Sequence, residues 1–369
     1  MAEPTTLHLG SPGGAAGPYD VVVGEGLLDL LPGVLGTSVR RVAVIAPVSL
    51  ASRATAVVER LAGEGYDAQL LGIPDGEAAK DVSVAADCWS TLGRTGFTRS
   101  DAVVTVGGGA TTDMGGFVAA TWMRGVRVVH MPTTLLAMVD AAVGGKTGMN
   151  TAEGKNLVGS FHEPSGVLCD LGHLGTLPGE ELVSGMAEVV KCGFITDPVI
   201  LDIVERSPRT AMTVGSAELR ELVERAIQVK IDVVAGDFRE TGGQGGHPGR
   251  EALNYGHTLG HAIERAEGYR LRHGEAVAVG MVYVAELARL AGLLDDATAD
   301  RHRSVLGSVG LPTSYADASW NELLRFMRID KKSRGDLLRF VVLKGLADPV
   351  VLEGPEQGLL EAAFAAVCG

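Results

Sequence analysis

The first half of the chain alternates short apolar runs, rich in β-branched residues, with longer amphipathic stretches. Short runs that are apolar at every position are typical of strands buried on both faces of a parallel sheet. The pattern therefore predicts strands at 40–47, 67–74, 101–109 and 126–132, with helices at 49–65 and 83–96. Strands that alternate with helices are typical of a doubly wound, Rossmann-like α/β sheet.

Long helical stretches replace this alternation after residues 175–180. They cover 182–195, 217–238, 252–264 and 275–294. The last is almost long enough to span a bilayer, but Glu286 and Arg289 interrupt it, so we interpret it as a buried helix. We expect an α/β domain at 1–177 and an all-α domain at 178–369.

Composition restricts the class of protein. A chain of 369 residues that is 46% hydrophobic can bury a large core in about two domains. A net charge of −13 argues against a broad nucleic-acid or membrane-binding surface. The four cysteines have no C-x-x-C spacing, which suits a reducing cytoplasm, and the start of the chain does not resemble a secretory leader.

Two turns in the first half are candidate nucleotide contacts. The strand at 101–106 leads into GGGATTD, and glycines at such a turn let backbone N–H groups approach a phosphate. The spacing is not G-x-G-x-x-G, so a tight turn without a ligand explains the motif equally well. Asp113 could contact a ribose hydroxyl or cap the helix. Thr133 and Thr134, in the turn after the next strand, could contact the cofactor or act as caps.

The segment 138–161 is rich in glycine and polar groups, among them Asp140, Lys146, Lys155 and Asn156. We expect neither a strand nor an ordinary helix here. Lysine is scarce, because only eight of the 32 basic residues are Lys, and the two lysines of this segment suit a dianionic ligand such as a phosphate ester. The alternative is a solvated loop.

The helical half carries candidate metal ligands. His257 and His261 are four residues apart, so they share one helix face, and His273 follows closely. Glu188 and Lys191 lie three apart on another helix. One glutamate with two histidines would leave an open coordination position, as in catalytic zinc sites. Spacing alone does not say which two histidines bind, and buried core histidines or an exposed Glu–Lys pair are the alternatives.

Several long stretches together resemble the 3-dehydroquinate synthases, a family of sugar phosphate cyclases. The stretches are PDGEAAK, GGGATTDMGGFVAATWMRG, PTTLLAMVDAAVGGKTGMNTAEGKNLVGSF, GMAEVVKCG, ALNYGHTLGHAIE, HGEAVAVGM and DKKSRGDLLRFVVL. The resemblance implies an NAD-binding α/β domain, a helical domain that binds metal and substrate, and NAD with Zn²⁺ or Co²⁺ as cofactors.

The resemblance also implies roles for matching residues. It makes Glu188, His257 and His273 the metal ligands and leaves His261 as an unliganded active-site histidine. The implied NAD contacts are Asp75, Gly76, Glu77, Lys80, Gly107, Gly108, Gly109, Asp113, Thr133, Thr134, Lys146, Lys155 and Thr176. The implied substrate and catalytic positions are Arg124, Asp140, Lys146, Asn156, Lys191, Lys230, Arg250, Asn254, His261 and Lys331.

The implied reaction belongs to the shikimate pathway. Its substrate is 3-deoxy-D-arabino-heptulosonate 7-phosphate and its products are 3-dehydroquinate and phosphate. NAD⁺ oxidises a hydroxyl, phosphate is eliminated, the hydride returns, and ring opening precedes an intramolecular aldol closure, so NAD is recycled. The family also implies a homodimer.

Two alternatives stay open at this point. A related sugar phosphate cyclase, such as an amino-dehydroquinate or valiolone-type synthase, would share most of the motifs. A metal-dependent polyol dehydrogenase would instead release NADH. The Gly-rich stretch 241–249 is predicted to be a surface insertion that leaves Arg250 in place.

Overall fold

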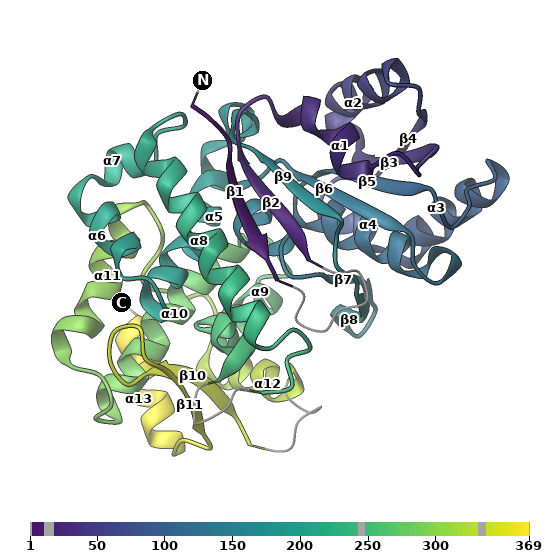
Figure 1. Ribbon diagram of the computed structural model, residues 1–369. Coiled ribbons are helices and arrows are strands. Elements are labelled where there is room, and N and C mark those ends of the chain that lie inside the picture. Colours follow the sequence, from purple (N-terminus) through teal and green to yellow (C-terminus); the bar gives the residue numbers. More distant parts are fainter. Residues whose placement is uncertain (1, 11–17, 243–247, 331–336, 369) are drawn as a thin grey trace. The chain divides into compact units, whose positions relative to one another are not determined.

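The computed structural model describes residues 2–10, 18–242, 248–330 and 337–368. The chain divides into two compact units, unit 1 at Met1–Leu177 and unit 2 at Pro178–Gly369 (Figure 1). Unit 1 contains a large sheet, and unit 2 consists mainly of helices.

Within the described residues of unit 1, seven strands form one sheet in the order β1-β2-β9-β6-β5-β3-β4. The strands are β1 Thr5–Leu9, β2 Tyr19–Gly24, β3 Arg41–Pro47, β4 Asp67–Ile73, β5 Ala102–Gly107, β6 Arg127–Pro132 and β9 Gly166–Asp170. β1 pairs antiparallel with β2, and the other pairings are parallel. The four predicted strands are confirmed as β3 to β6, whereas β1, β2 and β9 were not predicted.

Helices cover both faces of this sheet (Figure 1). They are α1 Leu31–Leu35, α2 Ala51–Gly63, α3 Val82–Arg94 and α4 Gly109–Thr121. Val44 of β3 packs with α1 and α2 in one core cluster, and the next residue, Ile45, packs with α3 and α4 in the other. Because successive strand side chains point to opposite faces, a strand covered on both sides must be apolar throughout. The predicted doubly wound sheet is confirmed.

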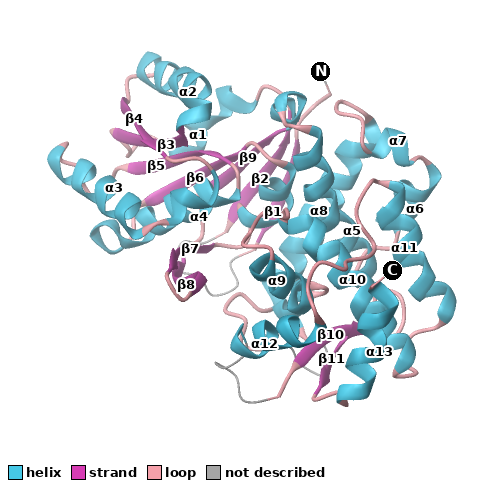
Figure 2. Cartoon of the chain, turned by 180° about the vertical axis from the view of Figure 1, so that it is seen from behind, coloured by secondary structure: helices cyan, strands magenta, loops and turns pink. Residues whose placement is uncertain are grey.

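A separate ribbon follows β6. Residues Lys146–Thr151 (β7) and Gly154–Phe161 (β8) pair antiparallel, so the expectation of no strand within 138–161 is wrong (Figure 2). Gly148 lies opposite Gly159, and a Cβ on Gly159 would come within 2.2 Å of the Thr147 carbonyl oxygen. The glycines that suggested a flexible loop are therefore what lets these two strands pair closely.

Unit 2 is helical, as predicted. Its helices are α5 Gly179–Ile195, α6 Val199–Arg206, α7 Pro208–Ala211, α8 Ala217–Gly236, α9 His257–Ala266, α10 His273–Leu290, α11 Asp296–Ser308, α12 Trp320–Asp330 and α13 Gln357–Val367. It also contains a two-stranded ribbon, β10 Arg339–Leu343 with β11 Pro349–Glu353, which the pattern did not predict (Figure 2). The ribbon packs on α10, where the rings of Phe340 and Tyr283 are 5.9 Å apart.

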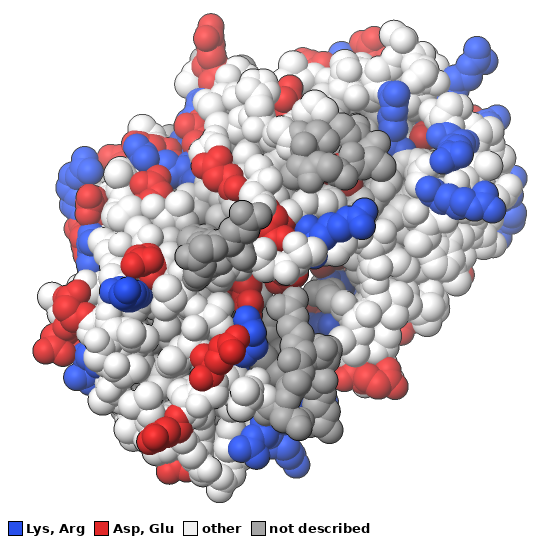
Figure 3. Space-filling view, turned by 60° about the horizontal axis from the view of Figure 1, so that its bottom comes forward, with Lys and Arg blue, Asp and Glu red and all other residues white. Residues whose placement is uncertain are grey.

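Charged side chains of both signs are spread over the face shown in Figure 3. Among the described residues, no helix combines the length and the apolar character needed to cross a membrane. Cys88, Cys169 and Cys192 are buried free thiols and Cys368 is exposed. Burial raises the pKa of Cys88 to about 11, so this thiol stays protonated and packs as a small apolar group.

Candidate active site

Three potential metal ligands of unit 2 come from three different helices. Glu188 lies in the middle of α5, whereas His257 and His273 are the first residues of α9 and α10. Their ligand atoms all lie within 4.8 Å of one another. Glu188 Oε1 is 3.5 Å from His257 Nε2 and 3.6 Å from His273 Nε2. The fold thus directs these three side chains to one point.

Glu188 presents an uncommitted carboxylate oxygen to this point. The residue is 1% exposed, and its Oε2 accepts a hydrogen bond from Lys191. Its Oε1 has no hydrogen-bond partner among the described residues. Burial acts to raise the pKa of Glu188, but Lys191 and the two histidines outweigh burial and hold that pKa well below its usual range. The buried carboxylate therefore stays ionised, as a metal ligand must be.

His257 is held in the form that binds metals. Its Nδ1 lies 3.1 Å from the carbonyl oxygen of Tyr255, and an Nδ1–H that donates there leaves the Nε2 lone pair directed at Glu188 Oε1. Burial, assisted by the nearby Lys191 charge, lowers the pKa of His257 to about 3. The ring is therefore neutral near pH 7, which is the state that coordinates a metal ion.

His273 has a carboxylate as its outer partner. Its Nδ1 lies 3.3 Å from Glu264 Oε2, an arrangement common around metal-bound imidazoles. Burial acts to lower the pKa of His273, but Glu188 and Glu264 raise it to about 10. The carboxylates of Glu188 and Glu264 thus favour a positive charge among these three ligands. A divalent cation fits this donor set of one carboxylate and two imidazoles.

A second group of possible ligands, His261, Glu264 and His273, also lies within 4.8 Å. In that group Glu264 contacts Nδ1 of His273, the nitrogen normally held by an outer partner, while Nε2 faces Glu188. We therefore favour the group that contains Glu188 as the primary site. The ring centroid of His261 is 5.3 Å from that of His257 and 6.2 Å from that of His273, so His261 lies beside the cluster.

Glycines set the spacing of the helices that carry the ligands. Gly274 N donates to Ser184 Oγ on α5 at 3.0 Å, and a Cβ on Gly274 would come within 1.9 Å of the Ser184 carbonyl oxygen. A Cβ on Gly280 would come within 1.9 Å of the carbonyl oxygen of Gly256, just before α9. Helix α10 is therefore in backbone contact with both of its neighbours, and no side chain fits between them.

Replacing Gly274 with alanine is expected to destabilise the protein by about 1–3 kcal/mol, because the added methyl group forces α10 away from α5. The same shift should weaken metal binding. Urea denaturation and a metal titration measure the two effects. As a matched control, Gly307→Ala in α11 meets no atom within 4 Å and should stabilise the protein slightly. Equal stabilities of the Gly274 variant and the wild type would contradict this view of the helix contact.

The predicted glycine turn of unit 1 joins β5 to α4. Gly108 precedes the helix without a capping side chain, so the first N–H groups of α4 are left to a ligand or solvent. A Cβ on Gly107 would lie 2.5 Å from Thr111 Oγ1. Thr133 N donates to the Gly107 carbonyl oxygen at 2.9 Å, which places the two predicted turns side by side at the carboxyl ends of β5 and β6.

A buried lysine connects several predicted cofactor residues. Lys80 is 2% exposed, and its ammonium donates to Asp113 Oδ2 at 2.5 Å and to Asn156 Oδ1. Asn156 N in turn donates to Asn150 Oδ1 at 3.0 Å. Asn150 Nδ2 donates to Glu77 Oε2 at 2.6 Å. One polar network therefore joins the turn before α3, helix α4 and the β7–β8 ribbon.

Lys155, Asp113 and Thr134 each had a structural alternative to cofactor binding. Lys155 Nζ lies 3.3 Å from Glu77 Oε1, so the second lysine of the ribbon joins the same group. Asp113 lies inside α4 and pairs with Lys80, so its interpretation as a helix cap is wrong. Thr134 does act as a cap, because its Oγ1 accepts a hydrogen bond from Ala137 N at 3.2 Å.

The remaining predicted cofactor residues lie at turns of unit 1. Asp75, just after β4, accepts a hydrogen bond from Ser49. Thr176 Oγ1 accepts one from Arg53. Gly76 has φ +60, a conformation that favours glycine. Asp75 follows the carboxyl end of its strand, the edge where open α/β sheets bind ligands.

Besides Asn156, three predicted substrate residues belong to unit 1. Arg124 is exposed in a tight turn with φ 69, and its neighbour Met123 has φ 49. Asp140 lies in a π-helical turn, Ala137–Ala141, and its charge acts to raise the pKa of Asp113. Lys146 is exposed at the start of β7.

Unit 2 holds three buried basic side chains from the predicted set. Lys191, Lys230 and Arg250 are 1%, 6% and 1% exposed. Arg250 N donates to Asp237 Oδ2 at 3.2 Å, and its guanidinium donates to the Phe238 carbonyl oxygen at 2.6 Å. The suggested Glu188–Lys191 surface pair is therefore wrong, because both residues are buried. Lys331 and residues 243–247 of the predicted insertion lie outside the described residues.

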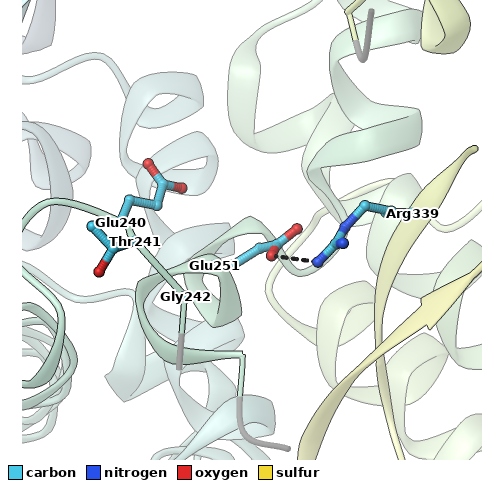
Figure 4. Close-up of a pocket in the computed structure, with 5 residues that line it drawn as sticks. All are labelled: Glu240, Thr241, Gly242, Glu251 and Arg339. Atoms are coloured by element: carbon cyan, nitrogen blue, oxygen red, sulfur yellow. Dashed lines mark hydrogen bonds and ion pairs between the residues drawn. The ribbon is translucent and has the colours of Figure 1, made fainter. Parts of the chain in front are cut away.

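A cavity of about 310 Å³ lies close to the predicted Asn254 (Figure 4). Its lining consists of Glu240, Thr241, Gly242, Glu251 and Arg339. Asn254 Nδ2 donates to Glu240 Oε1 at 3.2 Å. Arg339 pairs with Glu251 across 3.2 Å, the contact drawn in Figure 4. The metal cluster does not contribute to this lining.

Two supporting residues, Glu264 and Asn150, were not predicted from the sequence. Glu264 lies seven positions after His257, on the same helix face, and that spacing could have suggested an outer partner for a histidine. Asn150 lies within the Gly-rich block, but its pairing with Glu77 depends on a contact that spacing along the chain does not reveal.

Solved structures share both units. A 2-deoxy-scyllo-inosose synthase complexed with carbaglucose-6-phosphate, NAD⁺ and Co²⁺ has a TM-score of 0.87 and 26% identity, covering 98% of this chain and 100% of that one. A 2-epi-5-epi-valiolone synthase from Streptomyces hygroscopicus, with NAD⁺ and Zn²⁺ bound, has a TM-score of 0.85 and 27% identity over 95% of this chain and 96% of that one. The fold and the site place the chain among the sugar phosphate cyclases.

Sequence relatives narrow this class. The chain is 58% identical over 368 residues to the 3-dehydroquinate synthase of Streptomyces avermitilis, covering 100% of this chain and 99% of that protein. Family models for the N-terminal and C-terminal parts of 3-dehydroquinate synthase match residues 70–184 and 185–333. The chain belongs to the 3-dehydroquinate synthase family, which confirms the resemblance found in its motifs.

Proposed function

We propose that this protein converts 3-deoxy-D-arabino-heptulosonate 7-phosphate to 3-dehydroquinate and phosphate with NAD and a divalent metal ion. One observation supports the metal ion in this proposal. The ionised Oε1 of buried Glu188 has no hydrogen-bond partner among the described residues, and it faces Nε2 of His257 and Nε2 of His273. The bound ion would polarise substrate oxygens, and NAD would accept and return a hydride. The reaction is supported by relatives that are named 3-dehydroquinate synthase and match this chain over its full length.

NAD binding is assigned to unit 1. The uncapped start of α4 after the Gly107–Gly109 turn suits the pyrophosphate. The network around Lys80 fixes Asp113 and Asn156 close to that turn, so the cofactor would meet groups that are already ordered. Preordered groups lose little entropy on binding. Lys155 and Glu77, on the same network, complete the proposed contacts.

Substrate binding in unit 2 is assigned to buried cations. Lys191, Lys230 and Arg250 are all nearly inaccessible, and a positive charge in a buried site attracts an anion more strongly than it would in water. A substrate with a carboxylate and a phosphate carries the anionic groups that such a site attracts. Holding both ends of the substrate orients the reacting carbons, which is where much of the rate enhancement should come from.

His261 is assigned to proton handling. It lies beside the metal ligands but is itself exposed, so its ring can meet a bound substrate and exchange protons. The proposal also includes a cytoplasmic homodimer, as the family resemblance implies.

The reaction can be tested with the heptulosonate phosphate, substoichiometric NAD⁺ and Zn²⁺. Phosphate and 3-dehydroquinate should appear in equal amounts over many turnovers per NAD⁺, with no accumulation of NADH. Because the cofactor is recycled, the amount of added NAD⁺ should change the rate of product formation but not the final amount of product. NADH formed in proportion to the substrate consumed would identify a polyol dehydrogenase instead. A different carbocycle would identify another sugar phosphate cyclase.

A further inference from the structure

A fully buried tyrosine precedes the first histidine of the cluster. Tyr255 is 0% exposed, and its carbonyl oxygen holds Nδ1 of His257 at 3.1 Å. Its hydroxyl lies 2.8 Å from Nε2 of His302 on α11. The same residue therefore contacts a metal ligand through its backbone and a distant helix through its side chain.

His302 is itself fixed on three sides. Its Nδ1 lies 2.8 Å from the Thr298 carbonyl oxygen one turn earlier in α11. Its ring stacks on Phe194 of α5, with centroids 3.6 Å apart and planes at 10°. Burial lowers the pKa of His302 to about 4, so the imidazole is neutral. A neutral ring that donates from Nδ1 must accept at Nε2, so the Tyr255 hydroxyl is the donor.

We propose that Tyr255 and His302 are positioning residues for the metal ligand His257, an inference that rests on the proposed metal site. The hydroxyl bond to His302 fixes the Tyr255 side chain, which fixes the carbonyl oxygen that orients His257. The Nδ1–H of His257 then donates to this oxygen, and Nε2 keeps its lone pair for the ion. His302 also contacts α5, the helix that carries Glu188, so one buried ring connects the supports of two ligands.

A purely apolar role for Tyr255 would not explain this arrangement. Phenylalanine would fill almost the same volume, whereas only the hydroxyl can satisfy Nε2 of His302, which is buried with the rest of that side chain. An unsatisfied buried acceptor costs about 1–3 kcal/mol, so the Tyr255→Phe variant should relax by moving the two rings apart. That movement would displace the carbonyl oxygen and loosen the orientation of His257.

The test compares Co²⁺ binding by the wild type and by Tyr255→Phe, using a chelator competition and the visible spectrum of bound Co²⁺. We expect the variant to bind Co²⁺ about tenfold more weakly, the lower end of the range for losing an outer partner of a ligand, with an altered spectrum. His302→Gln, which can still accept from Tyr255 and donate to Thr298, should keep most of the affinity.

Tyr283→Phe is the matched control. Tyr283 is equally buried, but its hydroxyl donates to the Leu360 carbonyl oxygen at 3.4 Å, away from the ligands. It should lose stability without a change in Co²⁺ affinity or spectrum. Tyr255→Phe that behaves like this control would overturn the positioning role while leaving the metal site intact. A wild type that binds no Co²⁺, or whose binding survives His273→Ala, would overturn the metal site itself.

Discussion

Replacing His273 with alanine is expected to lower the affinity for Zn²⁺ or Co²⁺ more than about 100-fold and to abolish turnover. Loss of an outer partner alone typically weakens binding 10- to 100-fold, and this change removes a ligand. Wild-type protein should gain about 2.7 kcal/mol of stability when the free metal is 100 times its Kd, and the variant should gain almost none. Thermal unfolding with and without metal measures this difference independently of activity.

His261→Ala is the matched comparison. His261 lies beside the cluster, and its removal leaves Glu188, His257 and His273 in place. This variant should keep the metal-dependent stabilisation and lose turnover. Equal loss of metal in both variants would show that the ion binds in the second group, with His261 and Glu264, and our assignment of the ligands would be wrong.

The fold of unit 1 could be predicted where the local pattern and the tertiary environment agree. Strands β3, β5 and β6 are buried at nearly every position because helices cover both faces, and that burial can be read directly from the sequence. The ribbon β7–β8 was missed for the opposite reason. Strand β8 is largely exposed, so buried and exposed side chains do not alternate along it. Its glycines are also typical of a loop.

The ligand set could be predicted only with the help of the family resemblance. An i, i+4 histidine pair on α9 suggests two ligands from one helix, yet only His257 faces Glu188 Oε1. His273, at the start of the next helix, supplies the other nitrogen. Backbone contacts at Gly274 and Gly280 set the spacing of the helices that carry these residues, and residue spacing along the chain cannot reveal such contacts between helices. The hydrogen bond between Tyr255 and His302 is likewise a tertiary contact, because His302 lies 45 positions after His257 in the chain.

The burial of charged side chains is a second property that residue spacing along the chain could not predict. Glu188 and Lys191 at i, i+3 look like an ordinary surface pair, but α5 is enclosed along most of its length. The same holds for Lys80, whose PDGE-x-x-K motif gave no sign of its 2% exposure. A buried ion pair behaves differently from an exposed one, because removing one partner leaves the other charge uncompensated.

Lys80→Met is therefore expected to destabilise the protein by about 3 kcal/mol, near the lower end for a buried pair because the Asp113 side chain keeps 19% exposure. Burial already raises the pKa of Asp113, and Lys80 opposes that rise, so the variant should raise this pKa further. The lost attraction matters only while Asp113 is ionised. The stability deficit should thus be full above the pKa of Asp113 in the variant and shrink as the pH falls below it. Urea denaturation at several pH values measures the deficit.

A double variant separates stability from cofactor binding. Lys80→Met with Asp113→Asn removes the uncompensated charge, so most of the lost stability should return and its pH dependence should disappear. NAD⁺ affinity, measured by calorimetry, should stay about tenfold or more below that of the wild type, because the side chains that order Asn156 and the turn before α4 are still missing. Wild-type NAD⁺ affinity in the double variant would mean that the Lys80–Asp113 pair supports only the fold, and the cofactor contacts would then have to be sought among Glu77, Lys155 and the glycine turn.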